Sequence, residues 1–347
     1  MPCACSCRSA CSRNWACTGA EGGGNGHRFG RYRSGGAGPR LCGSTRPGNL
    51  MSDTRPSSTA LGAAMMRAAH LLLDQAPWLL EDPLALPLSG LSGEGALRGA
   101  VARLQAEFAQ RSDEDFAAVI LRDLRATILL RNRYAEDELE RAMAQGLRQY
   151  VMLGAGLDSF ALRRPDLAAR LDIFELDLPA TQDWKRQRLQ QLGLALPRSL
   201  HFVPADLERR TPLQALAGSA FRPGERAFFS WLGVTSYLSE AAVYGTLRGL
   251  AALAPGSAVV FSYGLQESLV GETGRRIGAV LKAGVAARHE SAAHDGFDPA
   301  ALSERLRGLG YSSLESLDVA AAQARYFSQR RDGLQSPPMT QMMRGVV

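Results

Sequence analysis

The chain has 347 residues, of which 46% are hydrophobic, so it has enough apolar material for a large core. It has no run of eighteen or more apolar residues, which argues against a membrane-spanning helix, and we expect a soluble protein. The formal net charge is +6, but residues 1–50 carry seven arginines and one acid and so hold all of it. The basic balance is therefore no reason to expect nucleic-acid binding by the rest of the chain.

Residues 1–50 differ from the rest because they are rich in Gly, Ser, Arg and Cys and poor in branched aliphatic residues. We expect a disordered extension. All six cysteines lie there without paired CxxC knuckles, so we predict no metal site and no cysteine chemistry. A mis-assigned start, with the true start at Met51, explains the extension best, and an organelle transit peptide is the alternative. A bacterial, cytoplasmic protein fits the remaining composition.

Residues 51–146 are mostly helical in pattern. Apolar residues recur three and four apart in the stretches 58–75 and 113–145. The proline-rich segment 77–90 separates these stretches and must break the helix. We predict a helical cap belonging to one domain that spans residues 51–347.

From residue 147 onward, short β-branched or aromatic runs alternate with helical segments. This alternation predicts an α/β fold with a parallel sheet covered by helices on both faces. Two later runs, YSSLESLD and ARYFSQRRDG, are expected to close the sheet as an antiparallel pair. The strands predicted before them are QYVMLGAG, LDIFELD, LHFVPADL, AFFSWLGV and SAVVFSYG.

The ends of the first three predicted strands carry the candidate binding residues. Gly154 and Gly156 allow a tight turn and a close approach of a ligand to the backbone. Asp177 follows about twenty residues later, where an acid can accept hydrogen bonds from both ribose hydroxyls. After the third strand, Asp206 can accept a hydrogen bond from an adenine amino group, and Leu207 offers its N–H and an apolar side chain. Together they indicate a nucleoside-containing cofactor.

A nicotinamide-dependent oxidoreductase is one alternative, because GAGLDS resembles the GxGxxG motif with Ser159 in the third place. Two observations argue against it. The third glycine is absent, and no catalytic Tyr/Lys pair is recognisable in a chain whose only lysines are Lys185 and Lys282.

Several motifs in one order resemble the leucine carboxyl methyltransferase family over about residues 57–335. The carriers are RAAHLLLDQAPWLLEDPLA, LLRNRYAEDELERAMAQGLRQYVMLGAGLDSFALR, FELDLPATQDWKRQRL, FVPADL, WLGVTSYLSEAAV and YFSQRRDGL. The resemblance implies a Rossmann-like class I methyltransferase fold with a mainly parallel, seven-stranded sheet. It also implies S-adenosyl-L-methionine as cofactor and methyl transfer to a carboxylate or hydroxyl oxygen of a small-molecule acceptor.

By position, the resemblance implies that Arg131 pairs with the methionine carboxylate of the cofactor, and that Arg67, near a second basic position, also binds the cofactor. A guanidinium suits a planar carboxylate because it can donate two parallel hydrogen bonds. The alternatives for Arg131 are a solvated helix face or an ion pair with Glu136. Further along the chain, the resemblance places Gly154 against the cofactor, Asp177 at its ribose, and Asp206 with Leu207 around its adenine.

The chain departs from the family pattern at Leu232, where family members often have a glutamate near the cofactor. The WLGV sequence resembles a bacterial variant, so we still expect cofactor binding. The departure keeps a second alternative open, namely a non-catalytic cofactor-binding protein.

Methyl transfer to a carboxylate needs no strong base, because that nucleophile is ionised at neutral pH. Transfer to a hydroxyl needs one, and no histidine is well placed. His289 and His294 are five residues apart and do not align on a helix, so we expect no metal. Trp231, Tyr237 and Tyr263 follow predicted strands and could face the sulfonium, although core packing is the favoured interpretation of each.

Overall fold

The computed structural model describes residues 56–286 and 293–347. The predicted extension over residues 1–50, its six cysteines, Met51 and His289 lie outside the described residues.

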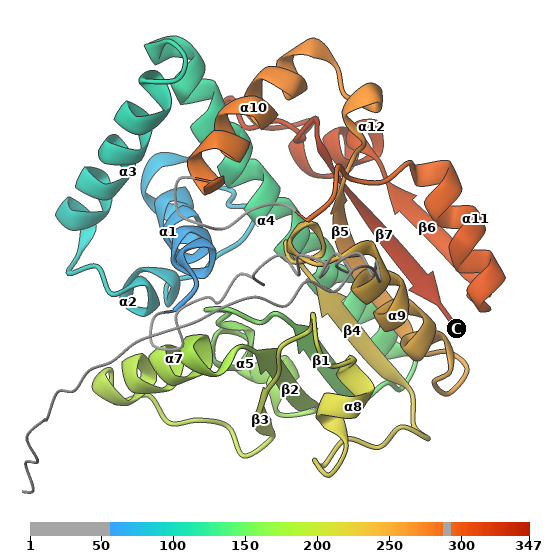
Figure 1. The fold of residues 1–347 in the computed structure, drawn as a ribbon. Coiled ribbons are helices and arrows are strands. Elements are labelled where there is room, and N and C mark those ends of the chain that lie inside the picture. The colour runs from blue at the N-terminus through green and yellow to red at the C-terminus, as the bar shows by residue number, and fades with distance from the viewer. Residues whose placement is uncertain (1–55, 287–292) are drawn as a thin grey trace, which may run out of the picture. The chain divides into compact units, whose positions relative to one another are not determined.

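In the described residues, four helices precede the first strand (Figure 1). They are α1 (Ser58–Leu73), α2 (Ala85–Ser89), α3 (Glu94–Ala109) and α4 (Glu114–Ala144). Two of them begin at capping residues: the Ser57 and Asp113 side chains accept hydrogen bonds from the N–H groups of Ala60 and Phe116. Apolar side chains of α1, α3, the first half of α4 and α10 (Glu272–Ala286) share one buried cluster. These helices therefore have a core of their own, apart from the sheet.

Seven strands form one sheet in the order β3-β2-β1-β4-β5-β7-β6. All run parallel except β7, which is antiparallel to both of its neighbours. This confirms the Rossmann-like class I methyltransferase fold. The strands are β1 (Gln149–Leu153), β2 (Asp172–Asp177), β3 (Leu200–Pro204), β4 (Ala227–Trp231), β5 (Ala258–Gly264), β6 (Ser313–Leu317) and β7 (Thr340–Val346).

The last predicted strand, ARYFSQRRDG, is wrong. Asp318 caps α12 (Val319–Ala322) by accepting a hydrogen bond from the Ala321 N–H, and the chain continues into the π-helical turn η3 (Gln323–Phe327). The antiparallel strand is β7 instead, whose sequence TQMMRGV has no aromatic residue and has β-branched residues only at its two ends.

Helices cover both faces of the sheet, because successive side chains of each strand point to opposite faces. In β1, Tyr150 and Met152 pack with α4 and α5 (Phe160–Arg163), whereas Val151 and Leu153 face the opposite side. On that side lie α8 (Pro212–Leu216), α9 (Glu240–Ala251) and α11 (Pro299–Leu309). The remaining elements are α6 (Pro165–Ala168), α7 (Pro179–Gln191) and the 3-10 turns η1 (Thr235–Tyr237) and η2 (Glu267–Leu269).

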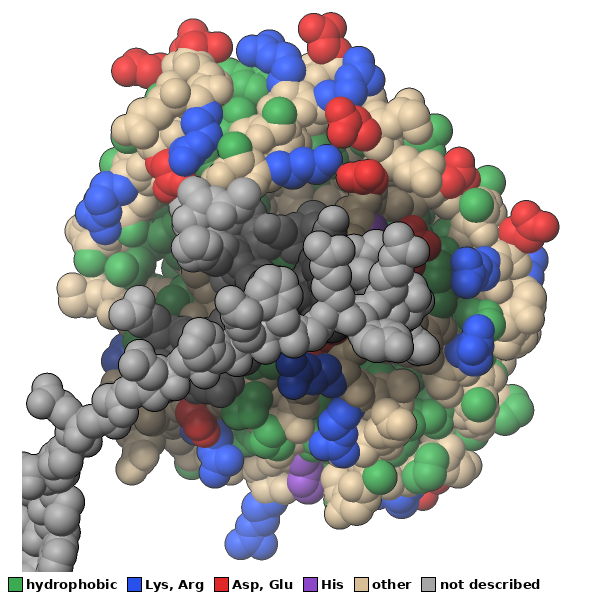
Figure 2. Space-filling view, in the orientation of Figure 1, with side chains coloured by type: hydrophobic (Ala, Val, Ile, Leu, Met, Phe, Trp, Pro, Cys, Tyr) green, Lys and Arg blue, Asp and Glu red, His purple; other side chains and the backbone are tan. Residues whose placement is uncertain are grey.

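Lys and Arg side chains are interspersed with Asp and Glu on the face shown in Figure 2, so neither sign of charge dominates the visible part. None of the helices in residues 56–286 and 293–347 is long and apolar enough to cross a membrane.

Candidate functional site

The carboxyl ends of β1, β2 and β4 lie at one edge of the sheet. Leu153, the last residue of β1, pairs with Leu176 on one side and with Trp231 on the other. Asp177 ends β2 next to Pro204, which ends β3. The segments that follow these four strands therefore meet at one edge, where open α/β sheets bind their ligands.

The two predicted glycines form the turn after β1, in a conformation that would be strained for residues with side chains. Gly154 has a φ of +70° and Gly156 a φ of +55°. A Cβ at Gly154 would lie 2.4 Å from Val234 Cγ2, and a Cβ at Gly156 would lie 3.3 Å from Ala60 Cβ. The turn is thus enclosed by the segment after β4 and by the start of α1.

The structure joins Gly156 directly to Asp177. The Gly156 N–H donates to Asp177 Oδ2 at 2.6 Å, and the Leu178 N–H donates to Oδ1 at 2.7 Å. Burial raises the pKa of Asp177, although these two hydrogen bonds oppose the shift. Each carboxylate oxygen keeps a second lone pair, so the group can still accept hydrogen bonds from a diol.

Asp206 and Leu207 follow β3 and lie next along the same edge. The Ala205 N–H donates to the backbone oxygen of Asp177 at 2.8 Å, which fixes the start of this segment beside β2. Asp206 Oδ1 accepts from the Glu208 N–H at 3.0 Å, and Leu207 is buried. The Asp206 side chain remains 41% exposed and so accessible to a ligand.

Arg131 lies on α4 with its guanidinium against the backbone after β4. A Cβ at Gly233 would lie only 1.9 Å from Arg131 Nη1. The Arg131 Nε is buried without a hydrogen-bond partner, and no ion pair among the described residues involves this guanidinium. Burial and the nearby charge of Arg67 lower the pKa of Arg131 to about 10. A partly buried cation without a counter-charge is costly, so this geometry favours an anionic ligand group.

Arg67, the second predicted basic residue, is already bound to two groups of the protein. Its Nε lies 2.8 Å from Asp82 Oδ2, and its Nη2 donates to the Leu157 backbone oxygen at 2.6 Å. Although burial pushes the pKa of Asp82 upward, the charges of Arg67 and Arg163 outweigh it and hold that pKa below its usual range. Arg67 and Arg131 therefore differ, because among the described residues only Arg67 has a carboxylate partner.

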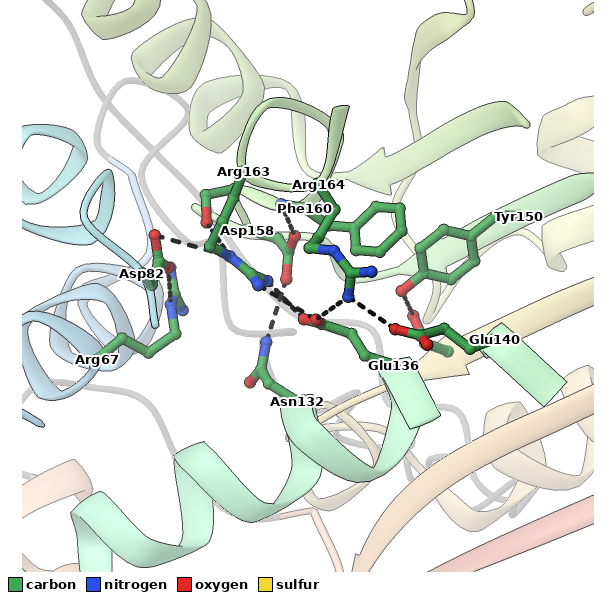
Figure 3. Close-up of polar contacts among 12 residues, drawn as sticks. Arg67, Asp82, Asn132, Glu136, Glu140, Tyr150, Asp158, Phe160, Arg163 and Arg164 are labelled. Atoms are coloured by element: carbon green, nitrogen blue, oxygen red, sulfur yellow. Dashed lines mark hydrogen bonds and ion pairs between the residues drawn. The ribbon is translucent and has the colours of Figure 1, made fainter. Parts of the chain in front are cut away.

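The two alternative interpretations of Arg131 are wrong. Glu136 does not pair with it but binds Arg163, with Nη2 to Oε1 at 2.5 Å, and lies 3.8 Å from Arg164 Nη1 (Figure 3). Five residues along a helix correspond to a rotation of about 140°, so Glu136 faces away from Arg131. Nor is Arg131 fully solvated, since the residue is only partly exposed and its Nε is buried.

Asp158 and Asn132 connect the turn to α4. The Asn132 Nδ2 donates to Asp158 Oδ2 at 3.2 Å, and the Phe160 N–H donates to Asp158 Oδ1 at 2.7 Å (Figure 3). Asp158 thus binds the first N–H of α5, and the same carboxylate anchors the turn to the helix that carries Arg131.

The three aromatic candidates have different environments. Trp231 and Tyr263 are buried, which confirms the core interpretation, and the Tyr263 hydroxyl donates to Gln341 Oε1 at 3.0 Å. Tyr237, in η1, is 37% exposed. Leu232, at the position of the family glutamate, packs against the core on the α4 side of the sheet.

The described residues contain no group of three His, Cys, Asp or Glu side chains that could hold a metal ion. His294 Nε2 lies 3.0 Å from the Thr235 backbone oxygen, and its Nδ1 accepts from the Gly296 N–H at 3.0 Å. Both ring nitrogens are therefore occupied by backbone groups.

Sequence reasoning assigned no role to Asp82, although the EDPLA motif that contains it was among the recognised motifs. Its partner Arg67 is fifteen residues away in the chain and on another element. No spacing rule joins the two, because the loop after α1 brings them together only in the folded protein.

Comparison with known proteins identifies relatives of this chain. A sequence model described as leucine carboxyl methyltransferase matches residues 60–251. YktD of Bacillus subtilis, provisionally named an S-adenosyl-L-methionine-dependent methyltransferase, is 30% identical over 294 residues, covering 82% of this chain and 95% of the relative. A protein of Frankia alni with the same provisional name is 33% identical over 196 residues, covering 56% and 64%. The structure of a DUF574 family protein from Streptomyces avermitilis is similar at 17% identity and a TM-score of 0.45, covering 68% and 90%.

Proposed function

This chain belongs to the leucine carboxyl methyltransferase family, and we propose that it transfers a methyl group to a carboxylate or hydroxyl oxygen of a small molecule. It is an S-adenosyl-L-methionine-dependent methyltransferase, as its family and relatives show.

The residues at the sheet edge fit this cofactor. The observation that carries the proposal is the Arg131 guanidinium, which forms no ion pair with any described residue and lies at the same edge as the Gly156–Asp177 hydrogen bond. The Arg131 guanidinium suits a carboxylate and the Asp177 carboxylate suits a ribose. S-adenosyl-L-methionine contains both a carboxylate and a ribose.

We assign the cofactor contacts accordingly. Arg131 would pair with the methionine carboxylate, and Asp177 would accept hydrogen bonds from the ribose. Gly154 and Gly156 would lie against the cofactor, since neither carries a side chain. Asp206 and Leu207 would frame the adenine.

The cofactor supplies an activated methyl group on a sulfonium, so the protein must mainly orient the acceptor and exclude water. A carboxylate acceptor would need no base, because it is already ionised at neutral pH. The family name refers to a carboxyl group, which supports an oxygen acceptor here. A small-molecule acceptor is part of the same proposal.

Family membership favours this function over the nicotinamide-dependent oxidoreductase. The third position of the glycine motif is Ser159, whose hydroxyl accepts from Arg163 Nε at 3.2 Å. Ser159 is thus hydrogen-bonded to an arginine that also binds Glu136. A non-catalytic cofactor-binding protein remains as an outcome of the test.

The test is methyl transfer from labelled S-adenosyl-L-methionine by the full chain to a panel of carboxylic acids, phenols, amines and thiols. We expect label on an acid or a phenol, and mild base will release it from an ester but not from an ether. Label on nitrogen or sulfur alone would refute the oxygen acceptor. Cofactor binding without transfer to any compound would favour the non-catalytic alternative.

Two arginines on α4 give a matched pair of variants. Arg131→Ala should lower the transfer rate at limiting cofactor at least about tenfold, because it removes the carboxylate partner. Arg133→Ala should leave the rate unchanged, since Arg133 is 47% exposed and paired with Asp137. Equal losses in both variants would contradict the assignment of Arg131.

A further inference from the structure

We propose that Asp82 and Arg67 are positioning residues that hold the turn after β1 in its cofactor-binding conformation, and that Arg131 alone recognises the cofactor carboxylate. This inference rests on the proposed cofactor contacts. It gives Arg67 a different role from the direct contact that the family resemblance implies.

The geometry of Arg67 supports a structural link to the turn. Its guanidinium spans from Asp82 Oδ2, at 2.8 Å, to the backbone oxygen of Leu157, at 2.6 Å. Leu157 directly follows Gly156, whose N–H binds Asp177. Arg67 therefore fixes the residue next to the one that orients the proposed ribose ligand.

Asp82 in turn fixes Arg67. Its side chain is 1% exposed, and its Oδ1 lies 4.0 Å from Arg163 Nε without a hydrogen-bond partner. Two guanidinium groups thus surround one buried carboxylate (Figure 3). A buried ion pair of this kind is costly to break from one side, because the remaining charge has no partner. Asp82 should therefore hold Arg67 in one position.

The start of α1 also contacts the same turn and the neighbouring helix α7. Ala60 packs against Gly156, and the Ser57 N–H donates to Thr181 Oγ1 on α7 at 3.3 Å. Loss of the Arg67 bond to Leu157 would remove a charge-assisted hydrogen bond from this side of the turn and leave the weaker van der Waals contact of Ala60.

Arg131 differs from Arg67 in its ion pairing. No described residue forms an ion pair with its guanidinium, whereas Arg67 has a buried carboxylate partner 2.8 Å away. A free anionic group would gain more from the unpaired cation.

The binding of two ligands can distinguish direct contact of Arg67 with the cofactor carboxylate from positioning of the turn by Arg67. S-adenosyl-L-homocysteine carries the amino-acid carboxylate, and 5′-methylthioadenosine has the same nucleoside and thioether without it. We would measure the dissociation constants of both by calorimetry with the full chain. Failure of the wild type to bind either ligand would contradict the proposed cofactor site itself, independently of the variants.

For Asp82→Asn we expect both ligands to bind about tenfold more weakly, because the turn is loosened for the shared nucleoside, a loss of about 1.4 kcal/mol. Arg67→Met should behave in the same way. Arg131→Met should weaken only the carboxylate-bearing ligand. If Arg67→Met weakened that ligand alone, Arg67 would contact the carboxylate and the proposal would be wrong.

The control is Asp74→Asn, which breaks another buried pair of the same helical region. Asp74 binds Arg125 Nε at 2.9 Å and His70 Nδ1 at 2.8 Å, away from the turn. This variant should lower the melting temperature and leave both affinities unchanged. Unchanged affinities in Asp82→Asn would show that the Arg67 pair is merely structural.

If Asp82→Asn does not fold, the double variant Arg67→Met/Asp82→Leu removes both charges and avoids an isolated buried ion. It should fold and still lose affinity for both ligands equally. Wild-type affinity in this variant would overturn the proposal.

Discussion

Gly233 shows how one residue can prepare a binding group on another element. Its φ of +69° and the position of Arg131 Nη1, 1.9 Å from where a Cβ would lie, leave no room for a side chain. Its N–H donates to Ser262 Oγ at 2.7 Å, which ties this loop to β5. The missing side chain therefore lets the guanidinium lie against the backbone after β4.

Asp123, also on α4, provides a prediction at the residue scale. Burial raises the pKa of this carboxyl to about 7, and no hydrogen bond or ion pair among the described residues involves it. The folded protein therefore holds a proton that the unfolded chain releases near pH 4. This contribution to the free energy of unfolding is complete below about pH 4. It is lost progressively as the pH rises to about 7, the pKa in the folded protein.

Asp123→Asn should remove that loss. Relative to the wild type, we expect the variant to gain on the order of 2–3 kcal/mol in the free energy of unfolding between pH 5 and pH 8.5. Urea denaturation at both pH values measures it. Asp115→Asn is the control, since Asp115 is exposed on the same helix. An equal difference from wild type at both pH values would contradict the assigned pKa.

At the scale of elements, buried polar contacts between the α7 side chains and strands β2 and β3 hold this helix against the sheet. Lys185 Nζ lies 2.5 Å from Glu175 Oε2, and both side chains are buried. The Gln182 side chain donates to the backbone oxygens of Glu175 and Val203. These contacts position β2, and with it Asp177 two residues further on.

Lys185→Met should lower the free energy of unfolding by about 3–5 kcal/mol, because Glu175 would remain buried without a counter-charge. The double variant Glu175→Gln/Lys185→Met should lose clearly less. Denaturant unfolding of both variants at pH 7 measures the difference. A larger loss in the double variant would show that the pair contributes more than it costs.

For the whole molecule, the alternating pattern predicted the parallel strands and the placement of the glycines and acids at one edge. This succeeded because strand ends are local features and parallel pairing brings them together. The pattern failed at residues 324–333, where the Asp318 cap started a helical turn instead of a strand.

The pairing of the arginines could not be predicted either. Asp82 and Arg67 meet through a loop, and Glu136 meets Arg163 across two elements. Sequence spacing identifies neighbours on one helix, but these pairs depend on how the helices before β1 pack against the sheet.

The most direct test of the cofactor site is calorimetric titration of the full chain with S-adenosyl-L-methionine and with NAD, repeated on Asp177→Ala. We predict one S-adenosyl-L-methionine site per chain, at least about tenfold weaker in the variant because the ribose partner is lost, and no binding of NAD. Binding of NAD in place of S-adenosyl-L-methionine, or an unchanged affinity in Asp177→Ala, would contradict the account.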